Sequence, residues 1–267
     1  MEHTSRVVIS GVPFDAYSSF LQGPALAPGR IREALRSNST NMSTENGLDL
    51  SKSQAWFDAG DVTLTNDAGG YARIAPATEE LLGQGGHVLS LGGDHSITYP
   101  LVQAHARKYP GLNILHLDAH PDLYDEFEGN RHSHACPFAR IMEAHLAHRL
   151  VQVGIRTANS HQRAQAERFG VEQIKMRRWQ PDSVLAFDGP LYLSLDMDVL
   201  DPAFAPGISH PEPGGLSTRE VLRIIQITKG NLVGADIVEY NPTRDPSGVT
   251  AMAAAKFLKE IVARMLE

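Results

Sequence analysis

The stretch Asp118-Ala-His-Pro-Asp122, which follows the apolar run Leu112-Asn-Ile-Leu-His-Leu117, decides the fold and the chemistry that this sequence predicts. The apolar run is typical of a buried strand, and the proline after it cannot extend a strand, so it marks the strand's end. Side chains alternate between the faces of a strand, so the two aspartates and the histidine, spaced two residues apart, are expected to point the same way. Buried carboxylates without a partner are costly, so the stretch predicts a bound cation.

On both sides of this stretch, apolar runs of strand length alternate with segments of helical spacing. The predicted strands are Arg6–Ser10, Trp56–Asp61, His87–Leu91, Leu112–Leu117, Leu150–Val153, Leu191–Leu195 and Leu232–Val238. The predicted helices are Arg30–Arg36, Tyr71–Gln84, Ile97–Lys108, Phe138–His148, Ser160–Phe169, Thr250–Leu266 and one that runs from the capping box at Ser217 to about Lys229. This alternation predicts an α/β fold, a three-layer α/β/α sandwich around a mostly parallel sheet. No linker or internal repeat divides the chain, so residues 1–267 are predicted to form a single domain.

One polar segment interrupts the alternation. Residues 37–53 are rich in Ser, Asn and Thr and are expected to form a surface loop. Loops of this length are uncommon in compact domains, so the segment suggests a lid or an oligomer contact. The sequence does not decide between these roles.

Composition narrows the functional class. Hydrophobic residues make up 42% and charged residues 21% of the chain, which fits an ordinary soluble globular protein. The net charge of −7 disfavours nucleic acid and favours a small cationic partner. The single cysteine, Cys136, indicates a reducing compartment. The first residues lack the pattern of a signal peptide and no apolar stretch has the length of a membrane helix, so the expected location is the cytoplasm, without membrane contact.

Polar residues gather directly after the predicted strands. Gly92-Gly-Asp-His95-Ser96, Asp118–Asp122, Asp196-Met-Asp198 and Glu239 each follow a strand, and His134 lies between the second and third of these groups. Ligands bind at the carboxyl ends of strands in parallel sheets, so these groups are expected to meet there. Taken singly, each group is as typical of a turn or a helix cap as of a ligand site. Their recurrence after three strands indicates a metal site.

The candidate ligands are two histidines and four aspartates, without a thiolate. Carboxylate and imidazole ligands suit Mn²⁺ or Mg²⁺, whereas thiolates would favour zinc or iron–sulfur clusters. Six protein ligands exceed what one small ion needs if it also keeps a water molecule. The set therefore favours two ions that share carboxylates, as in hydrolases that hold a hydroxide between two metals. The six predicted ligands are His95, Asp118, His120, Asp122, Asp196 and Asp198.

These motifs resemble the three signature motifs of the ureohydrolases, which include arginases, agmatinases and their relatives. Further resemblances lie in Asp58-Ala-Gly-Asp-Val62, Gly154-Ile-Arg156 and Asp236-Ile-Val-Glu-Tyr-Asn-Pro242, so the similarity covers nearly the whole chain. Within the family, Tyr124–Asn130 and Ser133–Glu143 are similar to agmatinases and to plant-type arginases. The resemblance implies an arginase-like sandwich with a sheet of roughly eight strands, and a homo-oligomer, trimer or hexamer.

The resemblance also implies a role for each site residue. It assigns two Mn²⁺ ions to each subunit, one held by His95, Asp118, Asp122 and Asp196 and the other by Asp118, His120, Asp196 and Asp198. Glu239 matches the carboxylate that binds the guanidinium group, and His134 matches a proton shuttle at the mouth of the site. A guanidinium stays protonated and offers parallel N–H donors, so a carboxylate suits it. A hydroxide would attack the guanidinium carbon, and Asp122 would pass a proton to the leaving amine.

The substrate is expected to be a small cationic guanidino compound that is hydrolysed to urea and an amine. The family distinguishes substrates through loops that here comprise Tyr124–His132 and Gly207–His210, and Asn130 and His210 are candidate substrate-binding residues. Ile208-Ser-His210 replaces the commoner Thr-Gly-Thr run, which favours agmatine, hydrolysed to putrescine and urea. The alternatives are arginase activity, which converts L-arginine to ornithine and urea, and hydrolysis of guanidinobutyrate or guanidinopropionate.

Other interpretations remain for parts of this pattern. A di-metal phosphoesterase would use similar ligands but needs cations for phosphate, and a non-catalytic relative would not need the full ligand set. Cys136, two residues from His134, could form a Cys–His nucleophile, but the metal site already supplies one. His116 shares the strand and is expected to be a hydrogen-bonded core residue rather than a ligand.

Overall fold

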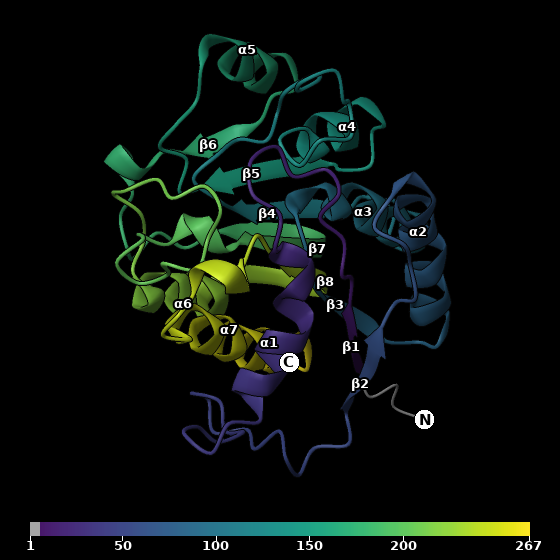
Figure 1. Ribbon diagram of the computed structural model, residues 1–267, viewed down its shortest axis with the longest axis vertical. Helices are drawn as coiled ribbons and strands as arrows, with labels where there is room; N and C mark the ends of the chain where they lie inside the picture. Colours follow the sequence, from purple (N-terminus) through teal and green to yellow (C-terminus); the bar gives the residue numbers. More distant parts are fainter. Residues whose placement is uncertain (1–5) are drawn as a thin grey trace.

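Eight parallel strands form the centre of the computed structural model, which describes residues 6–267 (Figure 1). Their order across the sheet is β2-β1-β3-β8-β7-β4-β5-β6, and every neighbouring pair within the described residues is parallel. The strands are β1 Val7–Gly11, β2 Trp56–Asp61, β3 His87–Leu91, β4 Asn113–Leu117, β5 Arg149–Val153, β6 Glu172–Ile174, β7 Ala186–Asp196 and β8 Lys229–Val238. Because all strands point the same way, their carboxyl ends meet at one edge of the sheet.

Helices cover both faces of this sheet (Figure 1). The helices α1 (Ala27–Leu35), α6 (Thr218–Ile227) and α7 (Val249–Met265) pack on one face. The helices α2 (Ala68–Gly83), α3 (Thr98–Lys108), α4 (Pro137–Glu143) and α5 (Ser160–Arg168) pack on the other. Short 3-10 helices are η1 (Pro24–Leu26), η2 (His95–Ile97), η3 (Met176–Arg178), η4 (Met197–Val199) and η5 (Pro242–Arg244). The predicted three-layer α/β/α sandwich is confirmed.

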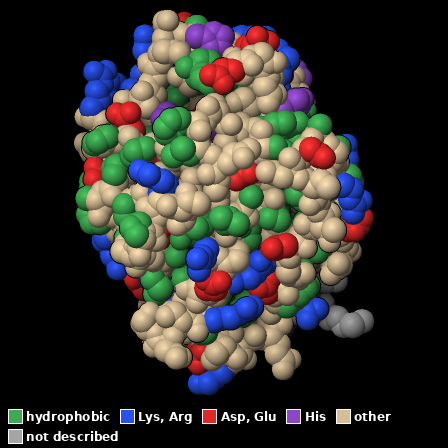
Figure 2. All heavy atoms as spheres, viewed as in Figure 1, with side chains coloured by type: hydrophobic (Ala, Val, Ile, Leu, Met, Phe, Trp, Pro, Cys, Tyr) green, Lys and Arg blue, Asp and Glu red, His purple; other side chains and the backbone are tan. Residues whose placement is uncertain are grey.

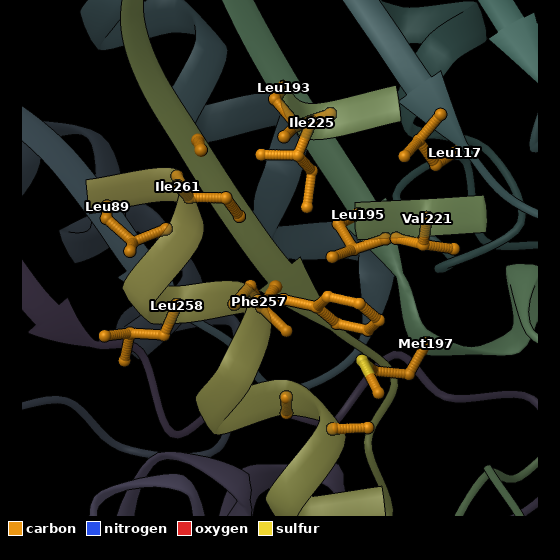
Figure 3. Close-up of a cluster of buried hydrophobic side chains, with 14 of the residues drawn as sticks. Leu89, Leu117, Leu193, Leu195, Met197, Val221, Ile225, Phe257, Leu258 and Ile261 are labelled. Carbon is orange, nitrogen blue, oxygen red and sulfur yellow. The ribbon is translucent and has the colours of Figure 1, made fainter. Parts of the chain in front are cut away.

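The apolar core explains why the sheet is a rigid platform. Leu193 and Leu195 of β7 face the same cluster as Phe257 of α7, and Figure 3 shows these side chains packed together. On the opposite face, Ile114 and Tyr192 join the cluster under α3 and α4. Full burial of each large apolar side chain contributes roughly 1.5–3 kcal/mol. The strand ends are therefore held in place by packing on both sides.

Several elements differ from the predictions: α1, α2 and β8 each begin three residues early, at Ala27, Ala68 and Lys229, and three further differences have clear causes. The strand β6 was not predicted, because its sequence Glu-Gln-Ile is short and polar and gains its strand conformation by pairing with β5. The helix α4 ends at Glu143 instead of His148, since His145 has a left-handed backbone with φ 53°. The strand β7 begins at Ala186, ahead of the predicted Leu191, although Gly189 and Pro190 interrupt its register with β8.

Residues 37–53 form an irregular segment that is pinned to α6 and α7. The carboxylate of Glu45 accepts two hydrogen bonds from the Arg219 guanidinium at 2.7 and 2.8 Å. The backbone N–H of Glu45 donates to the Glu260 carboxylate at 2.9 Å. Lys259 donates to the Asn41 carbonyl at 2.7 Å. No residue of this segment lines the cavity described below, so these contacts do not support a lid.

None of the helices within residues 6–267 is both long and apolar enough to cross a membrane. On the face shown in Figure 2, basic and acidic side chains are interspersed. Residues 1–5, where the sequence predicts no signal peptide, lie outside the described residues.

Candidate metal centre

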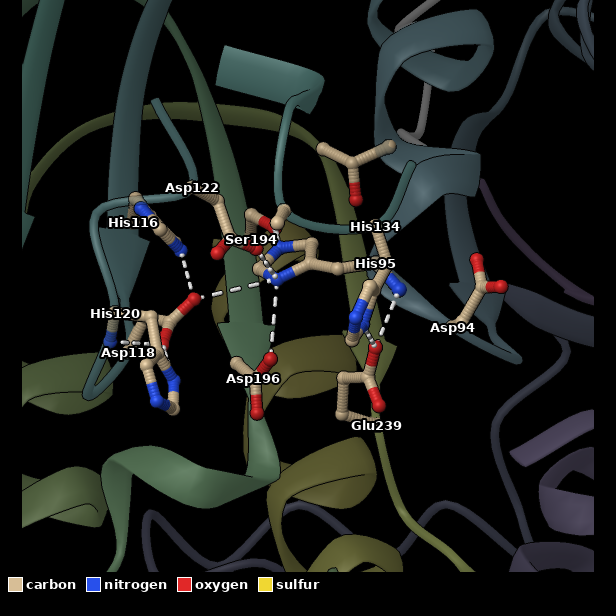
Figure 4. Close-up of polar contacts among 12 residues, drawn as sticks. Asp94, His95, His116, Asp118, His120, Asp122, His134, Ser194, Asp196 and Glu239 are labelled. Atoms are coloured by element: carbon tan, nitrogen blue, oxygen red, sulfur yellow. Dashed lines mark hydrogen bonds and ion pairs between the residues drawn. The ribbon is translucent and has the colours of Figure 1, made fainter. Parts of the chain in front are cut away.

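The six predicted ligands lie together at the carboxyl edge of the sheet. Figure 4 shows His95, Asp118, His120, Asp122 and Asp196. His95 opens η2 after β3, Asp196 ends β7, and Asp198 lies in η4. The expected strand geometry of Asp118–Asp122 is wrong, because β4 ends at Leu117 and Asp122 adopts a left-handed backbone with φ 49°. A turn, and not the alternation of a strand, directs these side chains into the site.

His95 shows the clearest sign that these residues can bind a cation. Its Nδ1 atom lies 3.0 Å from Asp196 Oδ2, 3.1 Å from Asp122 Oδ2 and 3.3 Å from Asp118 Oδ2. The side chain is fully buried, and this nitrogen has no hydrogen-bond partner within the described residues. Three carboxylate oxygens around one imidazole nitrogen are the arrangement that a divalent ion requires.

The other nitrogen of His95 explains why Nδ1 faces the carboxylates. Nε2 lies 2.9 Å from the Ser194 hydroxyl, and that hydroxyl donates to Asp236 Oδ1 at 2.7 Å. Because the hydroxyl proton is engaged with Asp236, Ser194 accepts a hydrogen bond from Nε2–H. Nδ1 then carries the lone pair, as a metal-binding imidazole needs. Ser194 and Asp236 are site residues whose role was not predicted from the sequence.

A second group of ligands adjoins the first. His120 Nδ1 lies 2.9 Å from Asp198 Oδ2 and 3.5 Å from Asp118 Oδ1. Asp118 thus offers Oδ2 to the group around His95 and Oδ1 to the group around His120. The nitrogen and oxygen atoms of His120, Asp118 and Asp198 lie close enough to hold one ion. The geometry therefore provides two adjacent positions that share a carboxylate.

His116 is close to the site but is hydrogen-bonded at both nitrogens. Gln152 Nε2 donates to its Nδ1 at 3.0 Å, which places the ring proton on Nε2, 2.7 Å from Asp118 Oδ2. Although its position beside His95 and Asp118 would suit a ligand, a protonated nitrogen cannot bind a metal. His116 therefore orients Asp118, in agreement with the predicted hydrogen-bonded core residue.

The charges of the site are mutually dependent. Burial favours neutral histidine, but the surrounding carboxylates raise the pKa of His95 well above its usual value and that of His120 to about 12. Burial and the neighbouring Asp118 raise the pKa of Asp198 to about 6. Burial also raises the pKa of Asp196, with Asp198 and Asp118 adding to it. The cluster thus holds more carboxylates than its histidines can neutralise, and it binds protons in part to compensate. Divalent cations would balance this negative charge, so the residues fit the expected metals.

Glu239 and His134 form a pair beside the ligands. His134 Nδ1–H donates to Glu239 Oε1 at 2.8 Å, and the backbone N–H of His95 donates to the same oxygen at 2.9 Å. Burial lowers the pKa of His134, but Glu239 and Asp94 outweigh it and raise the value to about 9. Glu239 has a left-handed backbone with φ 61°, a strained conformation that is common at functional sites.

The loop after β1 reaches over this pair. The hydroxyl of Ser19 lies 2.7 Å from His134 Nε2, and Asp94 Oδ2 accepts hydrogen bonds from the Tyr17 N–H at 3.0 Å and the Ser18 hydroxyl at 3.3 Å. Burial and the charge of Glu239 raise the pKa of Asp94 to about 7. Ser19 was not predicted as a site residue, because no motif or spacing in its segment distinguishes it from an ordinary loop serine.

A cavity of about 220 Å³ opens onto the ligands. It is lined by Ser19, His120, Asp122, Tyr124, Phe127, His134, Ala135, Thr157, Asn159, Gln162, Asp196, Asp198, His210 and Glu239. His210 lies in it with its ring centre 5.1 Å from that of His134, and its predicted contact with substrate stays a prediction. Asn130 does not line the cavity, since its side chain accepts the His132 N–H at 2.8 Å within its own loop. Its predicted contact with substrate stays a prediction.

Cys136 lies behind the cavity and does not form a nucleophilic pair with His134. The thiol is fully buried and points to the Asn130 carbonyl at 3.7 Å. Burial and the charge of Asp122 raise its pKa to about 12, so the reactive thiolate is disfavoured. The Cys–His interpretation has no support in this geometry.

Comparison with known proteins gives a consistent result. Residues 5–263 match the model of the arginase family. Arginase 1, mitochondrial, from Arabidopsis thaliana is 49% identical over 96% of this chain and 80% of its own length. An agmatinase from Bacillus anthracis is 36% identical over 97% of this chain and 91% of its own length. The solved structure of arginase from Medicago truncatula superimposes with a TM-score of 0.93 at 44% identity, covering 98% of this chain and 88% of that one.

Proposed function

The chain belongs to the arginase family of metal-dependent hydrolases, which cleave guanidino compounds to urea, and we propose that it is a manganese-dependent arginase that converts L-arginine to ornithine and urea. The observation that carries the chemistry is the unpartnered Nδ1 of His95 among three carboxylates, next to Glu239. The arginase relatives support arginine as the substrate. The sequence motifs favoured agmatine as the substrate. The comparisons favour arginine instead, because the relative named arginase is 49% identical and the relative named agmatinase is 36% identical.

Glu239 is suited to bind the guanidinium group. Its Oε1 accepts hydrogen bonds from His134 and from the His95 backbone, whereas no donor among the described residues contacts Oε2. A guanidinium with parallel N–H donors would complete the hydrogen bonding of this carboxylate. The two hydrogen bonds to Oε1 fix the orientation of the side chain, so the substrate carbon is held over the ligand cluster.

His134 is suited to exchange protons between the site and solvent. With a pKa of about 9, its imidazole is protonated at neutral pH. It lines the cavity, and its Nε2 contacts Ser19 on the outer side. Asp122, which also lines the cavity, is proposed to carry the proton between the attacking water and the amine.

Two Mn²⁺ ions are proposed for this site from the chemistry of its donor set. His95, Asp118, Asp122 and Asp196 would hold one ion, and Asp118, His120, Asp196 and Asp198 the other. When bound, such a pair lowers the pKa of water and supplies a hydroxide at neutral pH. The sharing of Asp118 between two ligand groups supports a pair rather than a single ion.

Urea release after Mn²⁺ activation tests this function. We expect arginine to be hydrolysed with a higher kcat/KM than agmatine or 4-guanidinobutyrate, each measured under the same conditions. A preference for agmatine would restore the substrate that the sequence favoured. An aryl phosphate serves as the control for a phosphoesterase, and hydrolysis of it in place of all guanidino compounds would overturn the proposal. A protein that binds no Mn²⁺ would instead be a non-catalytic relative.

We also propose that the protein is a cytoplasmic homo-oligomer, a trimer or a hexamer. The support is the resemblance for the oligomer and the single cysteine for the compartment. Light scattering coupled to size-exclusion chromatography measures the first. Cell fractionation with an antibody against the protein measures the second.

A further inference from the structure

The segment Gly154–Thr157 lies between the two turns that carry the aspartate ligands. It follows β5, the strand next to β4, and Gly154 has a left-handed backbone with φ 103°. A Cβ atom on this glycine would lie 2.6 Å from Val199 Cγ2 and 2.7 Å from the Asp118 carbonyl oxygen. Glycine therefore lets the segment touch both turns at once.

Backbone hydrogen bonds tie this segment to the first turn. The N–H of Arg156 donates to the Ala119 carbonyl at 3.0 Å, and the N–H of Thr157 donates to the same carbonyl at 3.3 Å. The N–H of Asp118 donates in return to the Val153 carbonyl at 3.0 Å. The backbone of Asp118 is thus fixed on both sides by the end of β5.

The side chain of Arg156 ties the segment to the second turn. Its Nη2 donates to the Asp198 carbonyl at 2.6 Å and to the Leu200 carbonyl at 3.2 Å, and Nη1 lies 3.3 Å from the Val199 carbonyl. Nε and Nη2 also donate to the Glu212 carbonyl at 2.8 and 2.6 Å. Glu212 belongs to the loop that carries His210, so one guanidinium joins the metal turn to a wall of the cavity.

A cation suits these acceptors for an electrostatic reason. The carbonyls of Asp198, Val199 and Leu200 belong to the end of η4, where peptide oxygens carry partial negative charge, and the Val199 carbonyl also accepts the Leu216 N–H at 3.0 Å. Among residues 6–267, no carboxylate forms an ion pair with Arg156. Its planar fork can serve several carbonyls in fixed directions, which the single ammonium of lysine cannot do.

We propose that Arg156 is a positioning residue that sets the distance between the Asp118 and Asp198 carboxylates, and so the affinity of the site for its metal pair. The role rests on the proposed function, since it requires that these aspartates bind metal. Arg156 does not line the cavity and is not one of the six predicted ligands, so it would act through the backbone of the two turns. Loss of a residue that holds a metal ligand in place typically weakens metal binding by about 10–100-fold.

The test compares Arg156→Lys with Arg264→Lys. Arg264 Nη2 donates to the carbonyls of Thr228 and Gly230 at 3.1 and 2.8 Å, next to the start of β8, so its replacement breaks similar hydrogen bonds far from the carboxyl edge. Free Mn²⁺ is measured by electron paramagnetic resonance during titration of each metal-free protein. Thermal unfolding of the metal-free proteins reports stability, and urea release at increasing Mn²⁺ reports activity.

We expect Arg156→Lys to bind Mn²⁺ about 10–100-fold more weakly than the wild type and to regain most of its kcat at high Mn²⁺. Arg264→Lys should keep the wild-type affinity while losing comparable thermal stability. Equal Mn²⁺ affinity in Arg156→Lys and the wild type would overturn the inference. A variant Arg156→Lys that fails to fold while Arg264→Lys folds would also overturn it, because Arg156 would then serve the fold. A wild type that binds no Mn²⁺ would instead refute the proposed function.

Discussion

His95 and His105 are equally buried, but they lie in two regions of the molecule that shift the pKa of a histidine in opposite directions. Both side chains are fully buried. At the carboxyl edge of the sheet, His95 faces three carboxylates, which raise its pKa well above the usual value against the effect of burial. Between α3 and β8, His105 has no carboxylate partner, and burial lowers its pKa to about 4. Burial alone therefore makes a histidine neutral, and the surplus of carboxylates makes the edge a cation site.

The environment of His105 shows what an apolar site does with the same side chain. Its Nδ1–H donates to the Leu101 carbonyl at 2.8 Å, and its Nε2 has no partner within the described residues. The ring packs on Tyr192 and against Gly234, where a Cβ would lie 2.3 Å from Nε2. Both regions hold an unpartnered imidazole nitrogen, so the neighbouring carboxylates, and not the unpartnered nitrogen alone, distinguish the metal site.

Removing the shared carboxylate should have the largest effect. In Asp118→Asn, both ligand groups lose an oxygen anion, so Mn²⁺ affinity should fall by more than about a hundredfold, beyond the loss expected for a residue that only orients a ligand. Urea release should fall to background. Calorimetric titration with Mn²⁺ measures the affinity. Asp67→Asn, which alters the cap of α2 by the same chemical change, is the matched control and should keep both properties.

Retention of full Mn²⁺ binding by Asp118→Asn would contradict the distinction between the surroundings of His95 and His105. It would mean that the carboxylate surplus at the edge serves another purpose, and that Asp118 acts only as the partner of His116.

The second prediction separates substrate binding from metal binding. In Glu239→Gln, the ligands stay intact and Mn²⁺ content should be unchanged. The guanidinium loses its carboxylate and His134 loses the charge that raises its pKa, so kcat/KM should fall by about 10²–10³, the cost of removing one charge-stabilising group from an active site. Metal analysis and urea release on the same sample measure both effects. Near-normal turnover would exclude Glu239 from the substrate site.

Much of this fold followed from the sequence because its signals are local. The strand His87–Leu91 has the predicted bounds, since its apolar run ends at a Gly-Gly turn. The capping box at Ser217 forms as expected. The strand β6 could not be predicted, because its pairing with β5 is a tertiary effect. The site was predicted for a reason that proved partly wrong, as Asp118–Asp122 converges through a turn rather than a strand.

The mouth of the cavity was much less predictable than its ligands. Metal ligands are recognised by residue type and by their place after strands. Phe127, Thr157 and Gln162 line the cavity, yet each is an ordinary loop or helix residue in the sequence. Ser194 and Asp236 lie within apolar strands, and only the folded geometry shows that they orient His95. We expect the choice between arginine and agmatine to depend on such residues, which lie outside the motifs.

The third prediction concerns acid stability. An unfolded chain protonates His105 near pH 6.5, whereas the folded protein does so only near pH 4. As pH falls through this interval, the unfolded state binds a proton that the folded state does not bind. The free energy of unfolding therefore falls by up to about 3 kcal/mol. The free energy of unfolding in urea, measured between pH 7 and pH 4 on metal-free protein, should fall less steeply in His105→Gln than in the wild type. Exposed His148→Gln is the control, and a profile of His105→Gln parallel to it would refute the prediction.

The smallest effect is expected at His116, a buried histidine whose environment is intermediate between those of His95 and His105. Burial lowers its pKa and the charge of His95 adds to this effect, although Asp118, which accepts its Nε2–H, raises it. The other nitrogen of His116 faces the neutral amide of Gln152. Gln152→Glu would place a second carboxylate against the ring, so the pKa of His116 should rise and its behaviour should approach that of His95. Mn²⁺ affinity should change by less than about tenfold, below the loss expected for a residue that orients a ligand directly, since Gln152 contacts none of the six ligands. Nitrogen-15 NMR of the imidazole follows the protonation state, and Gln152→Leu controls for the lost hydrogen bond to Pro121. A His116 that stays neutral beside the new carboxylate would show that carboxylates alone do not set the charge of buried histidines at this edge.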